Sequence, residues 1–380
     1  MTMAVDKQDK VLNVPTLRFP EFSGEWHRTT IGQCCSPLEY GMNAPAKEYD
    51  GKNKYIRITD IDEETCTYKY DDVVSPYALL EDKYKVLDND ILFARTGAST
   101  GKAYLYDKKD GLMYYAGFLI RGNVKPDFNS KFVFLQTQTQ KYKKWVDVMS
   151  IRSGQPGINS QEYSSFKFNL PPTKAEQDKI SSLFTLLDER ITAQIRIIDN
   201  IQSQIIGLEQ ILLKPKSSWT TYSIGDVLTI GSGRDYKHLS DGDIPVYGTG
   251  GYMLSVNDYL HDGESVCIGR KGTIDKPIYL RGKFWTVDTL FYTHDFRNIL
   301  PRYCYYLFNT INWQKYNEAS GVPSLSKETI ERIKISIPTA EDQKRICYII
   351  DSVEEKLTLE RTFLEKLILQ KQFLLSSLFV

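Results

Sequence analysis

Two long stretches of the chain carry apolar residues at intervals of three and four, the spacing of one face of an α-helix. We expect one helix over residues 171–214 and another over residues 338–380. The first apolar stripe consists of Ile180, Phe184, Leu187, Ile191, Ile195, Ile198, Ile201, Ile205, Leu208 and Leu212. The second consists of Ile346, Ile350, Val353, Leu357, Leu364, Ile368, Leu374 and Leu378.

Each of these helices would be about 60 Å long at 1.5 Å per residue. A single helix cannot bury so long a stripe, so the simplest arrangement is an antiparallel coiled coil of the two, with the rest of the chain at its opposite ends. The alternative is that both are core helices of one compact domain.

The ends of both stretches carry helix-capping residues. Thr173 with Glu176, and Thr339 with Asp342, place a hydroxyl and an acidic side chain near the free N–H groups of the first turn. Pro215 is expected to end the first helix, because proline disfavours helical backbone in the residue before it.

Outside the helices, short alternating runs predict strands, for example at 54–58, 90–95 and 265–270. Helical patterns at 131–146 and 301–316 lie among them. The expected fold class is therefore α+β, with mixed α/β structure in each half. The expected segments are a first domain over 1–170, a spacer helix over 171–214, a second domain over 215–337 and a second spacer helix over 338–380.

The chain repeats itself. LPPTKAEQDKI at residues 170–180 resembles IPTAEDQKRI at 337–346, and each leads into one of the long helices. Upstream, Ser-Gly-Gln-Pro at 153–156 corresponds to Ser-Gly-Val-Pro at 320–323. Trp26 with Thr-Ile-Gly after it has a counterpart in Trp219 with Ser-Ile-Gly. Because these anchors recur in one order while the sequence between them diverges, we expect a pseudo-twofold internal repeat.

The charge balance and the cysteine content disfavour several classes of protein. The chain has 48 basic and 48 acidic side chains, which disfavours a strongly basic protein that binds nucleic acid alone. Six cysteines without CxxC spacing or companion histidines predict reduced core thiols of a cytoplasmic protein. The opening MTMAVDKQDK lacks the apolar core of a secretion signal, and no apolar run is long enough to predict a membrane span.

A first candidate binding surface is a glycine loop that follows a strand in each half. An arginine at the end of a strand, with hydroxyls and a lysine after it, can reach phosphates and base edges. The alternative is a plain hairpin with a surface arginine. The candidate residues are Arg95, Thr96, Ser99 and Lys102 in the first half, and Arg270, Lys271 and Thr273 in the second.

A second candidate surface is the polar, glycine-broken segment shortly before each long helix. Its alternative is a linker that shapes the entry into the helix. The candidate residues are Arg152, Ser153, Gln155 and Asn159 in the first half, and Ser320 and Lys327 in the second.

No catalytic constellation is visible. The loop from Gly97 to Lys102 has one residue too few for a nucleotide P-loop and has Ala103 after the lysine. Asn169-Leu170-Pro171-Pro172 departs from the Asn-Pro-Pro-aromatic motif of DNA amino-methyltransferases. The four histidines are far apart in sequence and are expected to be isolated. We expect no cofactor or metal in this chain.

Arg18-Phe19-Pro20-Glu21-Phe22 with Trp26, the two divergent blocks and the duplicated Pro-to-Gln-x-x-Ile motif resemble the specificity subunit of type I DNA restriction-modification enzymes. The resemblance covers essentially the whole chain. It implies two target-recognition domains that each read one half of a split double-stranded DNA site, and helices that space them. It also implies two methyltransferase partners that bind S-adenosylmethionine, and in some assemblies restriction (motor-nuclease) subunits.

Two other hypotheses stay open from the residues. One is a coiled-coil scaffold that recognises protein partners through its variable blocks. The other is an enzyme with an unfamiliar site, which would have to turn over substrate as the purified chain.

Overall fold

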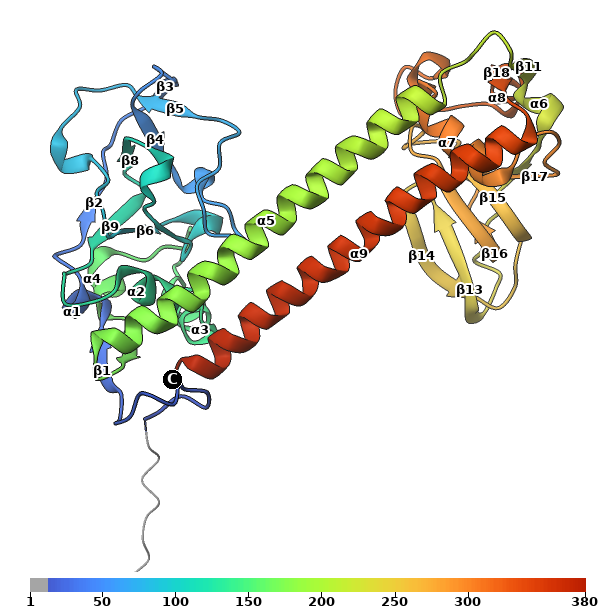
Figure 1. Ribbon diagram of the computed structural model, residues 1–380. Helices are drawn as coiled ribbons and strands as arrows, with labels where there is room; N and C mark the ends of the chain where they lie inside the picture. Colours follow the sequence, from blue (N-terminus) through green and yellow to red (C-terminus); the bar gives the residue numbers. More distant parts are fainter. Residues whose placement is uncertain (1–12) are drawn as a thin grey trace, which may run out of the picture. The chain divides into compact units, whose positions relative to one another are not determined.

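The computed structural model describes residues 13–380 (Figure 1). The described chain divides into two compact units, which we call unit 1 (residues 13–194 with 363–380) and unit 2 (residues 195–362). The opening segment, on which the expectation of no secretion signal rests, lies outside the described residues. No helix among residues 13–380 is long and apolar enough to cross a membrane.

A four-stranded antiparallel sheet forms the centre of unit 1, in the order β2-β9-β6-β7. The buried strand β6 (Asp90–Ala94) has one core on each side, because Ile91 and Phe93 face one cluster while Leu92 and Ala94 face another. The other strands of this sheet are β2 (Glu39–Tyr40), β7 (Ala103–Leu105) and β9 (Leu119–Asn123).

Shorter elements complete unit 1. Strand pairs β1–β10 and β3–β5 are antiparallel, whereas β4–β8 is parallel. Their bounds are β1 (His27–Thr30), β3 (Ala46–Glu48), β4 (Lys54–Ile56), β5 (Val74–Pro76), β8 (Met113–Tyr115) and β10 (Lys167–Leu170). The short helices are α1 (Ile31–Cys34), α2 (Ser130–Gln136), α3 (Gln140–Met149) and α4 (Ser160–Ser165). The 3-10 turns are η1 (Ile58–Asp60), η2 (Asp82–Tyr84), η3 (Gly97–Ser99) and η4 (Lys108–Asp110).

Unit 2 contains a six-stranded sheet in the order β12-β17-β15-β16-β13-β14, and all its pairs are antiparallel except β13–β16. Its strands are β12 (Thr229–Ser232), β13 (Asp241–Gly248), β14 (Gly251–Val256), β15 (His261–Gly269), β16 (Ile278–Thr286) and β17 (Leu290–His294). The antiparallel pair β11 (Thr220–Ser223) with β18 (Lys334–Ile337) corresponds to β1–β10 of unit 1. The helical segments are α6 (Ile224–Val227), α7 (Pro301–Thr310), η5 (Trp313–Tyr316) and α8 (Lys327–Arg332).

The two long helices are α5 (Lys174–Leu212) and α9 (Ala340–Leu378), close to the predicted ranges. In unit 1 the first half of α5 contacts the last part of α9, where Asp188 pairs with Lys371 at 2.8 Å. In unit 2 the end of α5 packs on the start of α9, through Ile205 against the cluster that contains Ile350. The helices therefore run antiparallel, as predicted, and the alternative of one compact domain is wrong.

The apolar stripe of α9 differs from the prediction near its end. Ile368 is 36% exposed, whereas Leu367 is 4% and Leu375 is 8% exposed. An alternation that begins with three residues leads from Leu357 to residues 360, 364, 367, 371 and 374, so Ile368 falls one position off this seam. Lys371 occupies the seam instead and is paired with Asp188.

Two predicted helices are interrupted. The range 131–146 divides into α2 and α3, because the hydroxyls of Thr137 and Thr139 donate to the carbonyls of Phe134 and Gln136. Thr139 then caps α3 by accepting from the backbone N–H of Tyr142. The range 301–316 likewise divides into α7 and η5.

The repeated motif glutamines have the same role in both units. Gln177 accepts from the backbone N–H of Asn129 at 3.0 Å, and Gln343 accepts from that of Leu300 at 2.8 Å. Both side chains are buried and bind the segment just before α2 or α7. The glutamine in each copy therefore fixes a long helix to its domain.

An ion pair also recurs in both units, formed by the residue two positions after Asn129 or Leu300. Lys131 of α2 contacts Asp188 of α5 at 2.6 Å, and Arg302 of α7 contacts Glu354 of α9. Burial alone would raise the pKa of the Asp188 carboxyl, but the charges of Lys131 and Lys371 lower that pKa overall.

The predicted cap of α5 is present, because the Thr173 hydroxyl accepts from the backbone N–H of Glu176 at 3.4 Å and Glu176 lies in the first turn. The side chain of Glu176 has a further role that the sequence did not predict. Its carboxylate is buried and receives two hydrogen bonds from Arg18, both at 2.8 Å, and one from the indole of Trp26 at 3.2 Å. Arg18 also donates to the carbonyls of Ser23 and Gly24. The Arg-Phe-Pro-Glu-Phe segment is thus bound to the start of α5 through a charge-assisted, two-point contact.

All six cysteines are free thiols, and five of them are buried. Burial raises the pKa of Cys34 to about 11 and those of Cys35, Cys267 and Cys347 to about 12. These thiols pack as small apolar groups, as predicted.

Candidate nucleic-acid interface

In unit 1 the glycine loop after β6 is paired with the polar loop before α4. The backbone N–H of Arg95 donates to Phe118 at 3.0 Å, and its carbonyl accepts from Ile158 at 2.9 Å. Two residues on, Gly97 donates to the carbonyl of Pro156 at 2.9 Å. The two candidate surfaces, about 60 residues apart in sequence, form one structure.

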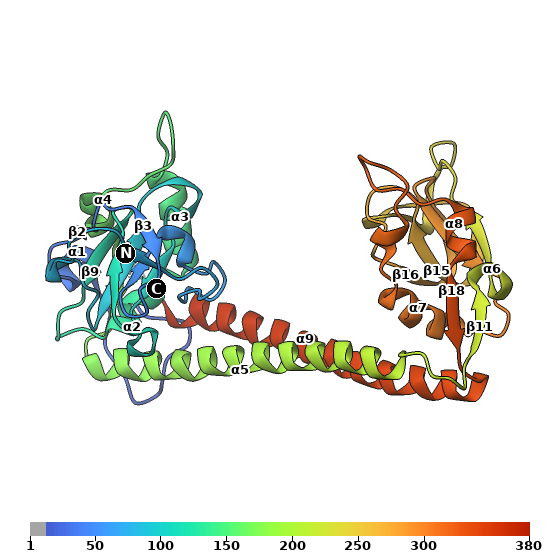
Figure 2. The same cartoon turned by 90° about the horizontal axis from the view of Figure 1, so that it is seen from above.

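Unit 2 repeats this pairing bond for bond. Arg270 donates to Thr289 at 2.8 Å and accepts from Leu325 at 2.9 Å, and Gly272 donates to Pro323 at 2.9 Å. We call these structures the paired loops, formed by residues 95–102 with 152–159 in unit 1 and by 270–276 with 320–327 in unit 2. In Figure 2 the later loop of each pair projects from the side of its own unit that faces away from the long helix beneath it.

Glycine is required at the same point of both loops. Gly97 has a φ of +70° and Gly272 has a φ of +88°, a backbone conformation that other residues rarely adopt. A Cβ at Gly97 would also lie 2.8 Å from the side-chain nitrogen of Gln155. The turn that follows each arginine therefore depends on glycine.

The Arg95 side chain is half-buried and held by two groups. Its guanidinium lies 4.9 Å from the ring centroid of Tyr40 and donates weakly to the carbonyl of Gly117 at 3.4 Å. The Tyr40 hydroxyl in turn accepts from the backbone N–H of Ser160 at 3.2 Å. Burial raises the pKa of Tyr40, but the bonds from Ser160 and the charge of Arg95 lower it overall.

The Arg270 side chain is exposed and lies over an aromatic ring as well. Its guanidinium is 5.8 Å from the ring centroid of Phe291 in β17. In both units an arginine therefore leaves a buried strand, stacks on a ring and keeps most of its donors available to a ligand.

Three candidate residues of the paired loops are engaged with glutamates elsewhere in unit 1. Lys102 forms an ion pair with Glu63 at 3.1 Å. Arg152 donates two bonds of 2.7 Å to Glu162. Asn159 caps α4 by accepting from the N–H of Glu162. These contacts order the loops and leave fewer donors for a ligand.

The remaining candidates lie along the same loops. Thr96 is bridged to Gly157, and Lys271 to Ser324, through their backbones. The exposed ones are Ser153, Gln155, Lys271 and Ser320, and the half-buried ones are Thr96, Ser99, Thr273 and Lys327.

Sequence reasoning missed the residues that hold the paired loops together. Tyr40 and Phe291 gave no signal, because each is distant in sequence from its arginine. Pro156 and Pro323 did give one, since both belong to the repeated Ser-Gly-x-Pro anchor.

Two histidines predicted to be isolated lie together on the sheet of unit 2. The rings of His261 and His294 are 6.0 Å apart, and Tyr292 packs on both. The strands β15 and β17 are neighbours, which the sequence pattern did not indicate. Across residues 13–380, no group of three or more His, Cys, Asp or Glu side chains is arranged to hold a metal ion.

Comparison with known proteins gives a consistent result. Over 143 residues the chain is 22% identical to the type I restriction enzyme EcoprrI specificity subunit of Escherichia coli, and the aligned part covers 35% of each protein. The aligned part therefore spans about a third of the length of that relative.

The fold is similar to that of two solved chains. One is the type I restriction-modification system S subunit from M. genitalium, with a TM-score of 0.65 and 17% identity over 97% of this chain and 99% of that one. The other comes from work on the complex assembly and conformational transition of the type I R-M system, with a TM-score of 0.59 and 14% identity over 93% and 97%.

A family model described as the type I restriction modification DNA specificity domain matches the chain twice, over residues 40–202 and 216–368. Each match contains one copy of the paired loops. Since these two ranges cover most of the sequence, the chain belongs to the family of type I restriction modification DNA specificity domains.

Proposed function

We propose that this chain is a non-catalytic recognition subunit that reads a bipartite site in double-stranded DNA, one half-site with each unit. The observation that carries the proposal is the duplication of the paired loops, with Arg95 and Arg270 at equivalent backbone positions. Family membership supports the same function.

The chemistry of the arginines fits base recognition. Arginine binds the O6 and N7 atoms of guanine through two parallel hydrogen bonds, the commonest specific contact in the major groove. Stacking on Tyr40 or Phe291 restricts the guanidinium before DNA arrives, which lowers the entropic cost of binding.

Partner subunits would supply the DNA phosphate contacts and the cofactor binding that we do not assign to this chain. Its 48 basic and 48 acidic side chains do not favour binding to DNA phosphates without help. We infer that two methyltransferase subunits embrace the DNA and bind S-adenosylmethionine, and that restriction (motor-nuclease) subunits join some assemblies. Acting on chromosomal DNA, the complex would be cytoplasmic.

The long helices offer surface to such partners. Large apolar side chains that face solvent on a soluble protein often mark interaction sites. Those on α5 and α9 that are more than half exposed are Leu186, Ile206, Ile211, Tyr348, Leu359, Leu369 and Phe373.

The proposal is tested by selecting DNA with the assembled complex. The full chain with its methyltransferase subunits is incubated with a random double-stranded library, and the retained DNA is sequenced. We expect two short conserved half-sites separated by a spacer of fixed length. The methyltransferase subunits without this chain are the control and should enrich no such pattern. An assembled complex that retains all sequences equally would contradict the proposal and favour a scaffold.

A further inference from the structure

A tight turn at residues 116–119 lies beside Arg95 in unit 1. The backbone N–H of Leu119 donates to the carbonyl of Ala116 at 2.8 Å and closes the turn. The carbonyl of Phe118, at the third position, accepts from the backbone N–H of Arg95 at 3.0 Å. The guanidinium of Arg95 donates to the carbonyl of Gly117 at 3.4 Å. The main chain and the side chain of Arg95 therefore both contact this turn.

Unit 2 has the same turn beside Arg270. The backbone N–H of Leu290 donates to the carbonyl of Val287 at 2.9 Å, and the carbonyl of Thr289 accepts from the backbone N–H of Arg270 at 2.8 Å. We call residues 116–119 and 287–290 the arginine turns. Because the turn occurs in both units, its backbone belongs to the structure that they share, whereas its side chains can differ.

The exposed side chains of the two arginine turns do differ in chemistry. In unit 1 the Phe118 ring is 59% exposed. In unit 2 Thr289 has the place of Phe118 and is half-buried, and the exposed side chain is the carboxylate of Asp288. Within residues 13–380, Phe118 belongs to none of the apolar clusters. Its ring therefore contributes little to the core and is accessible to a ligand that Arg95 binds.

The backbone that carries Phe118 is held from several sides. Ala116 donates to the carbonyl of Ile56 at 3.0 Å, and Gly41 donates to the carbonyl of Leu119 at 3.1 Å. Glycine is required at position 41, because a Cβ there would lie 2.2 Å from the carbonyl oxygen of Ala116. A large apolar side chain on a fixed backbone loses little freedom when it binds.

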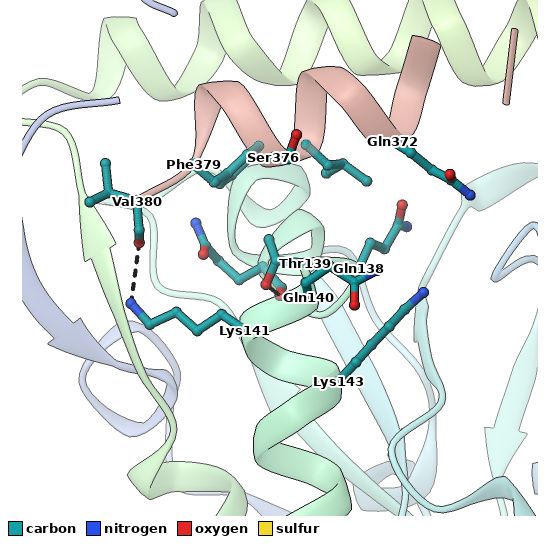
Figure 3. A pocket seen from close by; sticks show the side chains of 11 residues that line it. Gln138, Thr139, Gln140, Lys141, Lys143, Gln372, Ser376, Phe379 and Val380 are labelled. Atoms are coloured by element: carbon teal, nitrogen blue, oxygen red, sulfur yellow. Dashed lines mark hydrogen bonds between the residues drawn. The ribbon is translucent and has the colours of Figure 1, made fainter. Parts of the chain in front are cut away.

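Helix α3 supports the glycine loop that follows Arg95. The hydroxyl of Tyr142 donates to the carbonyl of Gly101 at 3.0 Å, and a Cβ at Gly101 would lie 2.6 Å from the side chain of Val146. The first turn of α3 lies beside the last turns of α9, and a cavity of about 240 Å³ separates them (Figure 3). Arg95 is thus held between two supported segments, the arginine turn and the glycine loop.

An exposed ring beside an arginine suits one feature of DNA. The bidentate contact of arginine with guanine is made in the major groove. A phenyl ring cannot donate or accept an ordinary hydrogen bond, and the apolar group that the base edges present in this groove is the methyl group of thymine. Neighbouring base pairs are about 3.4 Å apart, so a residue next to Arg95 can reach the pair beside the guanine.

We propose that Phe118 is a specificity-determining residue, which contacts the methyl group of a thymine next to the guanine that Arg95 binds. Burial of one methyl group should strengthen binding about fourfold. The inference rests on the proposed function, since it requires that Arg95 reads a base in the half-site of unit 1. It adds a second base pair of that half-site and the chemistry that reads it.

The test removes the methyl group from the DNA and the ring from the protein. The assembled complex selects its site as above, and R95A identifies the guanine of the unit 1 half-site by its loss of discrimination there. Each thymine of this half-site is then replaced in turn by deoxyuridine, which lacks the methyl group. We expect the replacement beside that guanine to weaken binding of the wild type about fourfold. In F118A the thymine and deoxyuridine sites should bind equally well.

Two further variants control for the loss of an apolar side chain. F118L keeps an apolar group at the turn and should retain part of the preference for thymine. V322A removes a side chain that is 67% exposed in the paired loops of unit 2, and should retain the full fourfold preference in the unit 1 half-site. F118A should melt at the temperature of the wild type, because the ring is exposed and outside the core.

Three results would overturn the inference. One is a half-site of unit 1 in which no deoxyuridine beside the guanine weakens binding. Another is an R95A complex that discriminates like the wild type, since no guanine would then be assigned to Arg95. The third is F118A that weakens binding to both DNAs equally, because a ring that stacks between bases does not need the methyl group. Failure of the proposed function looks different, since the complex would then enrich no half-site at all.

Discussion

Arg95 and Arg270 occupy equivalent places, but their side chains are held to different degrees. Arg95 is half-buried between Tyr40 and the carbonyl of Gly117, whereas Arg270 is exposed over Phe291. A guanidinium that is already oriented loses less freedom on binding. We therefore expect Arg95 to contribute more to sequence discrimination than Arg270.

Removing these arginines should relax specificity at one position of each half-site. We expect R95A and R270A each to lower discrimination at the affected base pair by about 1–3 kcal/mol, without loss of the methyltransferase subunits. R95K is the matched control, because it keeps the charge but loses the bidentate geometry, so it should retain general DNA affinity and lose discrimination. Competition binding with single-base variants of the selected site measures this. Wild-type discrimination in R95A and R270A would refute the assignment.

Asp188 should contribute to stability in a pH-dependent way. Its pKa is lowered in the folded chain, so its contribution is present above the unfolded pKa, near 4, and is lost as pH falls through the folded value. We expect D188N to destabilise unit 1 by about 1–2 kcal/mol at pH 7, between exposed and buried ion pairs, and by less below pH 4. Urea unfolding at both pH values measures this.

The matched control for Asp188 is E189Q, which removes an exposed carboxylate of the same helix within unit 1. It should change stability little at either pH. A D188N effect that is as large at pH 3 as at pH 7 would mean that packing, not charge, explains the loss.

The sequence alone predicted some of the residues described above, but few of their contacts. Arg95, Gly97 and their counterparts were singled out as candidates because they recur, and their backbones occupy equivalent positions. The Tyr40 ring and the Glu162 partner of Arg152 were not, because these contacts join residues that the sequence pattern does not connect. Thr173 and Glu176 were correctly placed at the first turn of α5, but the contact of the Glu176 carboxylate with Arg18 was missed, because the two residues are 158 positions apart.

At the scale of elements, periodicity predicted α5 and α9 to within three residues at each end. A stripe of about 40 residues is a strong signal, because each turn repeats it. The break between α2 and α3 was missed because Thr137 and Thr139 end one helix and cap the next through local hydrogen bonds, without any glycine or proline. The pairing of the two loops was missed because it depends on distant backbone contacts.

The helices as spacers can be tested by insertion near Gln202 in α5. Four added residues lengthen a helix by about 6 Å and turn it by about 40° beyond one revolution, so the apolar face is nearly kept. We expect an active complex whose spacer is longer by about two base pairs, given about 3.4 Å per base pair. Two added residues rotate the face by about 200° and should abolish assembly. Methylated-base mapping that shows an active four-residue variant with the original spacer would favour flexible attachment of the domains.

For the whole molecule, the sequence repeat predicted two copies of one plan, and each unit contains the paired loops, the motif glutamine and the repeated ion pair. The sheets differ, with four strands in unit 1 and six in unit 2. The repeated short motifs indicate the structure that both units share. The sequences between them do not repeat, so they gave little information about the size of each sheet. This contrast is what a common scaffold with two different targets would produce.

The most direct test of the central claim is a domain exchange. Residues 20–168 are replaced by the equivalent block of a relative, and methylated bases are mapped across the genome of a host that expresses the hybrid with its partner subunits. We predict that one half of the methylated motif changes while the other half and the spacer stay the same. A change in both halves, or in the spacer alone, would contradict the account that each unit reads its own half-site.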